Sequence, residues 1–300
     1  MNKQELSALV AEILANLPQS PQVKGGEYKP YTPGPEQPKN DYASGDFVPD
    51  ITALDLRKLY LTENARDKEG FARLKSRTPA RLGSGRAGPR YKTLTMLRFR
   101  ADHAAAQDAV FSQVPEGYAK EHDFLPVQTC CESKDMYLTR PDLGRRFPEA
   151  TQKVLKEVLQ PNAKVQLVVG DGLSSAAILA NAVDCLEAMK DGLKAKGISV
   201  GKVPFVRYCR VGAGDAIGDI TGCELVCMLV GERPGLVTDK SMSCYITYKP
   251  HTGVSESSRT VVSNIHAQGT PAVEAGAHVA NLIVKILEKK VSGVGLIAEG

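Results

Sequence analysis

The sequence has no apolar run approaching the roughly 20 residues that a membrane-spanning helix needs. Its N-terminus mixes acidic with apolar residues and lacks the basic region and apolar block of a secretory signal. The formal net charge is only +4, from 38 basic and 34 acidic residues. Bulk charge therefore gives no reason to expect nucleic-acid binding. We expect neither a membrane nor a nucleic acid among the partners.

The sequence also lacks the cysteine patterns of a disulfide framework or a zinc site. Its seven cysteines are odd in number and lie mostly in apolar, strand-like runs, which favours free thiols in a reducing, intracellular setting. Cys223 and Cys227 stand four positions apart on an expected strand, with no CxxC motif and no histidine nearby. We therefore expect no metal site.

Familiar catalytic motifs are missing as well. The sequence contains no GxxxxGK(S/T), HExxH or GxSxG motif and no carboxylate pair spaced for acid–base work. Gly212, Gly214 and Gly218 follow an expected strand and resemble a dinucleotide fingerprint. The third glycine is one position late, however, and no acidic residue ends the next strand. A nicotinamide oxidoreductase is therefore disfavoured, and we expect no catalytic set on this chain.

The first 49 residues divide into two segments. Residues 1–17 have apolar positions at helical spacing and predict a short amphipathic helix. Residues 18–49 hold seven of the eighteen prolines and few aliphatic side chains, which indicates a flexible, disordered linker. The residues alone leave two alternatives open: the helix docks back on the domain, or it lays its apolar stripe in a groove of a partner.

Residues 50–160 predict a small helical region with a basic loop. Helices are expected from Asp50, over Thr93–Phe111 and over Pro148–Leu159, with a hairpin within Leu125–Leu138. The stretch Arg73–Arg100 has nine basic residues and no acidic one. Such a basic run is either a solvated face or a binding surface. Few aromatic residues are present to stack on nucleic-acid bases. The run therefore favours a loop that presents Arg86 and Arg90 to carboxylates or phosphates.

Residues 161–300 alternate strands with helices and predict an α/β fold, a Rossmann-like, mostly parallel sheet with flanking helices. A helix capped by Ser174 or Ser175 should run to about Lys196, and another should start at Thr270 and Pro271. Between the expected strands Val203–Val211 and Glu224–Val230 we expect only a short, poorly helical connection. The expected strands are Val165–Val169, Val203–Val211, Glu224–Val230, Ser243–Tyr248 and Arg259–Ile265.

Glycine-rich loops follow these strands. They read GDG, RVGAG, GERPG and HAQGTP, and the stretch Phe205–Gly235 carries two of them. At the carboxyl ends of parallel strands, such loops expose backbone N–H and C=O groups at one edge of a sheet. That edge suits a large, amide-rich ligand, so we expect a binding surface rather than a reaction centre.

A family resemblance extends from about Thr78 to Gly293. The segments TPARLGSGRAGPRYKT, LRFRADHA, MYLTRPDLGRR, VVGDGLSS, FVRYCRV, LVGERPGL and SNIHAQGTPAVEA together resemble the small-subunit (light-chain) family of ethanolamine ammonia-lyase. The resemblance implies an adenosylcobalamin-dependent carbon–nitrogen lyase that converts ethanolamine to acetaldehyde and ammonia by a radical mechanism. It also implies a large-subunit partner that holds the substrate, with cobalamin between the two subunits and no catalytic residue on this one.

The resemblance carries three cobalamin-binding positions onto this chain: Val211 at the end of FVRYCRV, Glu232 in GERPG, and Val261 in SRTVVSNIH. Some relatives have cysteine at the last position, so only a backbone contact would survive there. Without the resemblance, the competing interpretation of Glu232 is an ion pair with Arg233 or another nearby arginine. The chain lacks an Asp-x-His-x-x-Gly motif, so we expect the cofactor to keep its own base on cobalt and no protein residue to ligate the metal.

The resemblance also gives the N-terminal helix a role. It implies that residues 1–17 target the enzyme into the protein shell of a bacterial microcompartment within the cytoplasm. The competing interpretation is a non-catalytic cargo or scaffold protein of an ethanolamine-utilisation microcompartment, whose loops bind only a partner.

Overall fold

The computed structural model of the protein describes residues 50–55, 57–62 and 66–298. The expectations for residues 1–17 and 18–49 lie outside the described residues. Among the described helices, none combines the length and apolar character that crossing a membrane requires.

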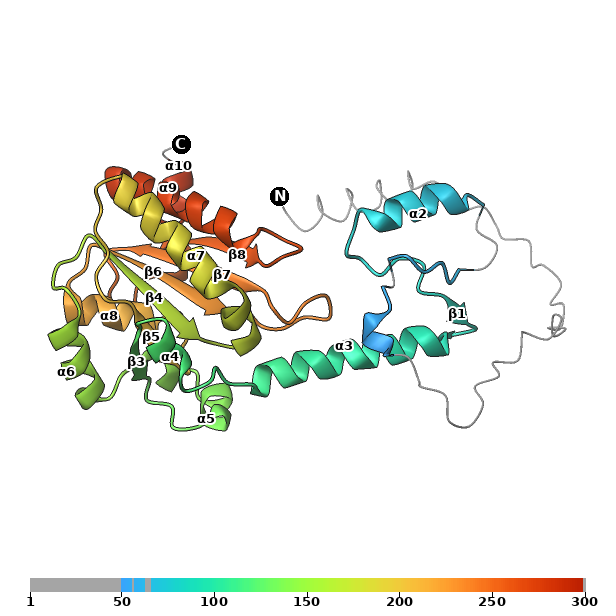
Figure 1. Cartoon of the computed structure of the whole chain (residues 1–300), viewed down its shortest axis with the longest axis horizontal. Coiled ribbons are helices and arrows are strands. Elements are labelled where there is room, and N and C mark those ends of the chain that lie inside the picture. The colour runs from blue at the N-terminus through green and yellow to red at the C-terminus, as the bar shows by residue number, and fades with distance from the viewer. Residues whose placement is uncertain (1–49, 56, 63–65, 299–300) are drawn as a thin grey trace, which may run out of the picture. The chain divides into compact units, whose positions relative to one another are not determined.

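The centre of the described fold is a six-stranded mixed sheet with the order β3-β5-β4-β6-β7-β8 (Figure 1). The first four strands in this order are mutually parallel, whereas β7 is antiparallel to both of its neighbours. This confirms the expected α/β class. The strands are β3 (Leu125–Gln128), β4 (Val165–Asp171), β5 (Pro204–Arg207), β6 (Leu225–Gly231), β7 (Met242–Tyr248) and β8 (Arg259–Ile265).

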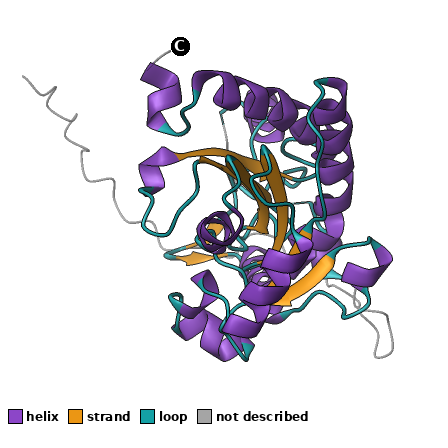
Figure 2. Ribbon diagram, turned by 90° about the vertical axis from the view of Figure 1, so that its left-hand side faces the viewer, coloured by secondary structure: helices purple, strands orange, loops and turns teal. Residues whose placement is uncertain are grey.

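Helices cover both faces of the sheet (Figure 2). Helix α7 (Ser175–Ala195) connects β4 to β5 and packs with α9 (Ala272–Lys289) on one face. Helix α8 (Ala213–Thr221) connects β5 to β6 and packs with α6 (Glu149–Val158) on the other. Since β5 and β6 flank β4 on opposite sides, this is a doubly wound arrangement, and its topological switch point lies at the carboxyl ends of β4 and β6.

The core forms where the central strands meet these helices. Every residue of β4 and of β6 is buried, as expected for parallel strands covered on both faces. Helix α7 begins where its sequence predicts, because the Ser174 hydroxyl oxygen accepts a hydrogen bond of 3.0 Å from the Ala177 N–H. The predicted bounds of β8 are also confirmed.

The connection between β5 and β6 differs from expectation. Strand β5 ends at Arg207 instead of Val211, because Tyr208 adopts a left-handed backbone conformation with φ 57°. The chain then forms α8, although this segment was expected to be poorly helical. Its glycines serve close packing: a Cβ on Gly218 would lie 2.4 Å from the Pro250 carbonyl oxygen. Val211 therefore lies in the turn before α8 and does not end a strand.

The hairpin expected within Leu125–Leu138 is absent from this described segment. Strand β3 instead pairs in parallel with β5, and α5 (Lys134–Thr139) follows it. Ser133 starts that helix, since its hydroxyl oxygen accepts a hydrogen bond of 3.2 Å from the Met136 N–H. The short helix α4 (Tyr118–Glu121) precedes β3. The sheet therefore extends across the division that we placed between residues 160 and 161.

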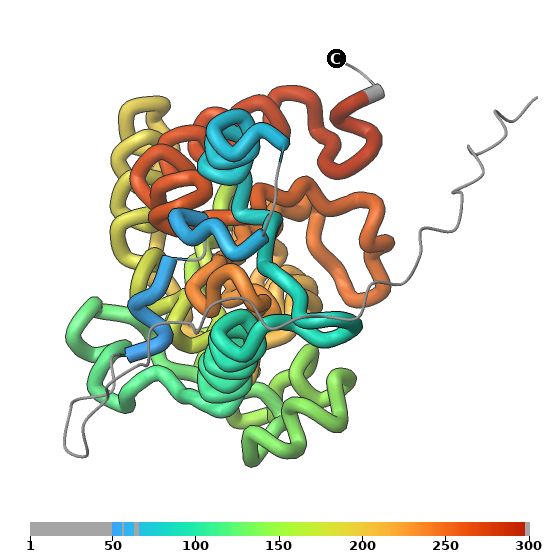
Figure 3. The backbone as a smooth tube through the Cα atoms, turned by 90° about the vertical axis from the view of Figure 1, so that its right-hand side faces the viewer, coloured from blue at the N-terminus to red at the C-terminus, as the bar shows by residue number. Residues whose placement is uncertain are grey.

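An arm, made of the described residues between 50 and 111, precedes the sheet (Figure 3). It contains the single turn η1 (Ile51–Ala53), α2 (Lys68–Ser76), the short strands β1 (Arg86–Ala87) and β2 (Arg90–Tyr91), and α3 (Thr93–Phe111). The predicted bounds of α3 are confirmed. The longer helix expected from Asp50 is not formed, because the Arg98 guanidinium binds the carbonyls of Ile51, Thr52 and Leu54, which a continuing helix would use.

A buried ion pair joins β8 to α8. The Arg259 guanidinium donates two hydrogen bonds of 2.7 Å to the Asp215 carboxylate, and only 3% and 7% of these side chains are exposed. Arg259 also contacts Glu256 at 2.8 Å. Such bidentate geometry fixes the two elements relative to each other.

We predict that Arg259→Ala will lower the free energy of unfolding by about 3–5 kcal/mol, because the Asp215 carboxylate would stay buried without its partner. Urea-induced unfolding followed by circular dichroism would measure this loss. Arg140→Ala is the matched control, since its pair with Asp142 is exposed and should change stability little. Equal effects of the two substitutions would contradict a structural role for the Arg259 pair.

Candidate functional site

The loops after β4 and β6 touch at the switch point. The Leu173 N–H donates a hydrogen bond of 3.3 Å to the Gly231 carbonyl oxygen. A Cβ on Gly231 would lie 2.0 Å from the Ser174 carbonyl oxygen, so only glycine permits this approach. The GDG and GERPG loops thus meet at one edge of the sheet, as their sequence predicts.

Glu232 follows directly and is held by groups from two other strands. Its Oε1 accepts hydrogen bonds from the Ser243 hydroxyl at 2.5 Å and from the Asn264 N–H at 3.0 Å. Its backbone N–H donates to the Ser241 carbonyl oxygen at 3.0 Å. Within the described residues Glu232 forms no ion pair. The alternative interpretation, an ion pair with Arg233, is therefore not observed there.

The turn after β8 holds the Asn264 N–H in place. Asn264 has a left-handed backbone conformation with φ 63°, and its side-chain oxygen lies 2.8 Å from His266 Nε2. His266 Nδ1 accepts a hydrogen bond of 3.2 Å from the Gln268 N–H, which assigns the ring proton to Nε2. Both ring nitrogens of His266 are therefore engaged within this turn.

The surroundings of Glu232 favour its ionised form. Partial burial raises the pKa of this carboxyl, but the hydrogen bonds from Ser243 and the Asn264 N–H outweigh it and bring the pKa below its usual value. The Ser241 hydroxyl also favours the carboxylate, although its oxygen is buried without a hydrogen bond of normal geometry. Oε2 of Glu232 has no hydrogen-bond partner among the described residues. Glu232 is thus a carboxylate with one acceptor oxygen to spare.

The three residues predicted for the site lie on the same side of the sheet. Val261 pairs with Tyr245 across β7 and β8, so the two side chains share a face. Tyr245 and Val211 both pack against the hydrophobic cluster on the α8 side. Ser243, which donates to Glu232, stands two residues before Tyr245 on β7 and therefore shares this face, so the Glu232 carboxylate lies beside it.

This face is open over the outer strands. Val261 is 45% exposed and Tyr245 is half-buried, although the neighbouring central strands are covered completely. The Val211 carbonyl already accepts a hydrogen bond of 3.0 Å from the Gly214 N–H. Val211 therefore offers a ligand its apolar side chain more readily than its carbonyl. The arrangement combines an apolar wall with one ionised acceptor.

The sequence interpretation missed Ser243, Tyr245 and Ser241. Ser243 is almost fully buried and alternates along β7 with the apolar Met242 and Cys244. A buried serine in a strand is a weak signal by itself. Its role becomes visible only once the pairing of β6, β7 and β8 brings it beside Glu232.

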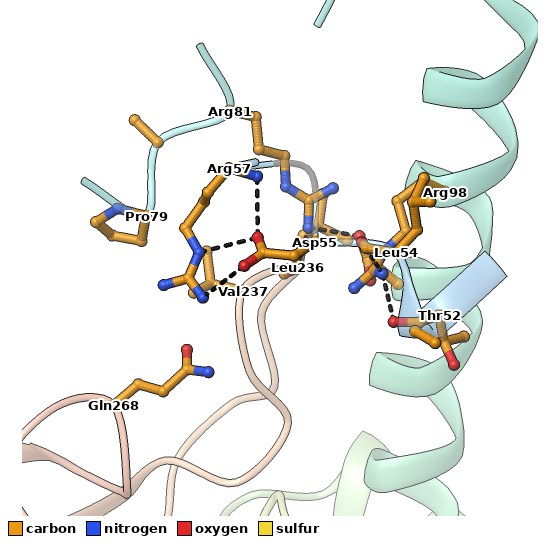
Figure 4. Close-up of a pocket in the computed structure, with 13 residues that line it drawn as sticks. Thr52, Leu54, Asp55, Arg57, Pro79, Arg81, Arg98, Leu236, Val237 and Gln268 are labelled. Carbon is orange, nitrogen blue, oxygen red and sulfur yellow. Dashed lines mark hydrogen bonds and ion pairs between the residues drawn. The ribbon is translucent and has the colours of Figure 1, made fainter. Parts of the chain in front are cut away.

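A separate pocket of about 240 Å³ lies between the arm and the loops after β6 and β8 (Figure 4). Its charged side chains pair with one another: Arg57 with Asp55, and both Arg81 and Arg98 with Asp102. One positive charge remains in excess, but each of these charged side chains already has a partner, and Arg98 also binds three backbone carbonyls. The pocket therefore makes a weaker ligand site than the surroundings of Glu232.

The cysteines do not form a metal centre in the described part of the chain. No group of three or more histidine, cysteine, aspartate or glutamate side chains could hold a metal ion there. All seven cysteines are free, and six of them are buried. Burial raises the pKa of Cys185 to about 12, as expected for a thiol that serves packing.

Comparison with known proteins gives consistent matches. The sequence model of the family described as ethanolamine ammonia-lyase light chain matches residues 68–297. An ethanolamine ammonia-lyase small subunit from Clostridioides difficile is 59% identical over 83% of this chain and 85% of its own length. One from Clostridium perfringens is 52% identical over 99% of this chain and all of its own length, and one from Listeria monocytogenes is 57% identical over 83% and 85%.

We predict that Gly231→Ala will destabilise the protein by about 1–3 kcal/mol, because the new methyl group overlaps the Ser174 carbonyl and must displace backbone. Thermal unfolding followed by circular dichroism measures this. Gly235→Ala in the same loop is the control, since its Cβ would meet nothing within 4 Å. A Gly231→Ala protein as stable as this control would show that the two loops are not in tight contact.

Proposed function

This chain belongs to the ethanolamine ammonia-lyase light-chain family, and from that premise we propose that it forms one side of an adenosylcobalamin site whose other side belongs to the large subunit. The observation that carries this proposal is the spare acceptor oxygen of Glu232 beside an open apolar face. The substrate would be ethanolamine, and the products acetaldehyde and ammonia.

The residues present fit the cofactor. The corrin ring carries amide side chains, whose N–H groups need acceptors, and Oε2 of the ionised Glu232 is such an acceptor. The buried Ser241 hydroxyl favours the ionised form of Glu232 but is too deeply buried to contact a ligand itself. The open face that carries Val261 and Tyr245 suits the apolar surface of the macrocycle, and Val211 would extend this wall from the turn before α8.

In this proposal the chain binds, orients and shields. Adenosylcobalamin, when bound, supplies the radical that removes a hydrogen atom from the substrate, and the large subunit supplies the substrate groups. Glu232 would fix the orientation of the corrin by accepting an amide hydrogen bond. The apolar face would exclude water from one side of the cofactor. No proton-transfer step is assigned to this chain.

We also propose that no residue of this chain ligates cobalt, so that the cofactor keeps its own base there. His266 is the histidine beside Glu232, and both of its ring nitrogens are engaged within the turn after β8. Freeing Nε2 would break the contact that orients Asn264. This supports the base-on state, which electron paramagnetic resonance of the cob(II)alamin form would test.

The large-subunit partner follows from the family, and we propose the arm as part of the surface that it contacts. Only Lys75, Thr95 and Ala109 are buried among the described residues of the arm. Its exposed apolar side chains are Leu74, Leu82, Tyr91, Leu94, Met96, Leu97 and Phe111. Exposed apolar groups interspersed with the basic residues of Arg73–Arg100 suit a partner surface that is partly acidic.

We predict that Glu232→Gln will weaken adenosylcobalamin binding to the two-subunit complex by roughly tenfold, because a hydrogen bond to a charged acceptor is replaced by one to a neutral amide. Equilibrium dialysis, with cobalamin detected by its absorbance, gives the dissociation constant. Glu187→Gln is the control, since Glu187 is exposed on α7 and forms a surface ion pair with Lys190. An unchanged dissociation constant for Glu232→Gln would overturn the proposed site.

For residues 1–17 we propose targeting to the shell of a bacterial microcompartment, because the apolar stripe of a short amphipathic helix suits a groove of a partner. We predict that deleting these residues will leave the activity of the two-subunit enzyme unchanged and abolish its co-purification with shells. Leu14→Glu should reproduce the packaging defect, whereas Glu12→Gln, off the apolar stripe, should not. Loss of activity in the deletion variant would contradict this role.

A further inference from the structure

We propose that Ser243, with the turn of Asn264 and His266, is a positioning device that fixes the Glu232 carboxylate in one orientation, with Oε2 presented to an amide donor of the ligand. This inference rests on the proposed function of the site. It gives a positioning role to three residues for which the family resemblance implies no function. It also explains how a single carboxylate can orient a large ligand.

The geometry carries the inference. The Ser243 hydroxyl and the Asn264 N–H both donate to the same oxygen, Oε1, from β7 and from β8. Two donors that converge on one oxygen fix the rotation of the carboxylate about its final bond. The other oxygen then keeps its full accepting capacity and a defined direction.

The turn after β8 makes one of these donors rigid. His266 Nε2 holds the Asn264 side chain at 2.8 Å, and the Thr270 N–H donates to the Asn264 carbonyl oxygen at 2.9 Å. Gly269 packs so closely that a Cβ would lie 2.3 Å from that same carbonyl oxygen. The direction of the Asn264 N–H is therefore set by several contacts and does not depend on the ligand.

Both donors stabilise the ionised form of the carboxylate, whereas partial burial favours its protonated form. Since the hydrogen bond from Ser243 lowers the pKa of Glu232 and burial raises it, removing the Ser243 hydroxyl shifts that pKa upward. A raised pKa means that the acceptor becomes protonated as the pH falls, first at the acidic end of the working range. Among the described residues, the titratable groups that act on Glu232 are His266, from the turn after β8, and Tyr245, from β7.

The test measures adenosylcobalamin binding to the intact two-subunit complex between about pH 5 and pH 8, around and above the usual carboxyl range. We compare the wild type, Ser243→Ala, Glu232→Gln and the double variant. Ser243→Ala should weaken binding on the order of tenfold at the acidic end and less at neutral pH. In the Glu232→Gln background the acid-dependent part of this loss should disappear, because the amide of glutamine does not titrate.

Ser292→Ala is the matched control. Ser292 is also a buried serine, accepts a hydrogen bond of 3.0 Å from the Tyr248 N–H and donates one of 2.5 Å to the Ser258 carbonyl oxygen, at the opposite end of β7. It should leave the dissociation constant and its pH profile unchanged. An acid-dependent loss in Ser292→Ala equal to that of Ser243→Ala would show general destabilisation and overturn the positioning role.

The outcomes separate the two proposals. If Glu232→Gln leaves binding unchanged, the cobalamin site itself is misplaced. If Glu232→Gln weakens binding but Ser243→Ala acts equally at every pH and adds fully to Glu232→Gln, the site stands and the positioning role fails. Should Ser243→Ala not fold, His266→Ala serves instead, since it releases the Asn264 side chain and should shift the profile in the same direction; an unshifted profile would overturn the proposal.

Discussion

The complete burial of β4 and β6 is the constraint on which the rest of the structure depends. Parallel strands of this kind need helices on both faces, and the chain supplies them by crossing from β4 to β5 with α7 and from β5 to β6 with α8. The connection that leaves β4 leads toward β5 and the one that leaves β6 leads toward β7, so the two diverge at the carboxyl ends of β4 and β6. The loops that meet there lie at an edge that no crossover covers, and the close contact of Gly231 with Ser174 follows from their meeting.

The antiparallel strand β7 turns this edge into a site. Because β7 runs opposite to its neighbours, its first residues lie beside the last residues of both β6 and β8, as the pairing of Met242 with Gly231 and with Ile265 shows. Ser243 and Asn264 are thereby brought to Glu232 from separate strands. An all-parallel sheet would place the start of that strand at the far end and leave Glu232 without its donors.

Much of the fold could be predicted because its signals are local. Ser174 caps α7, and the apolar pattern of β8 gave its bounds. The predictions were wrong where contacts between residues distant in the sequence determine the structure. Arg98 binds the backbone carbonyls that a helix from Asp50 would need. Gly218, which was expected to disfavour a helix, is part of α8 because it packs closely against Pro250. For the site, Glu232 came from family resemblance, whereas Ser243 required the strand register, which no single-sequence pattern contains.

The Arg259–Asp215 pair explains how the two sides of the open face keep a fixed position relative to each other. Val261 belongs to β8 and Val211 precedes α8, and this buried bidentate pair joins these same two elements. A face fixed by a buried ion pair loses little conformational freedom when a rigid ligand binds to it, so more of the contact energy remains for affinity. Glu232, fixed by Ser243 and Asn264, follows the same principle on a smaller scale. A binding surface built this way needs no catalytic group of its own, provided that the ligand and the second subunit bring the chemistry.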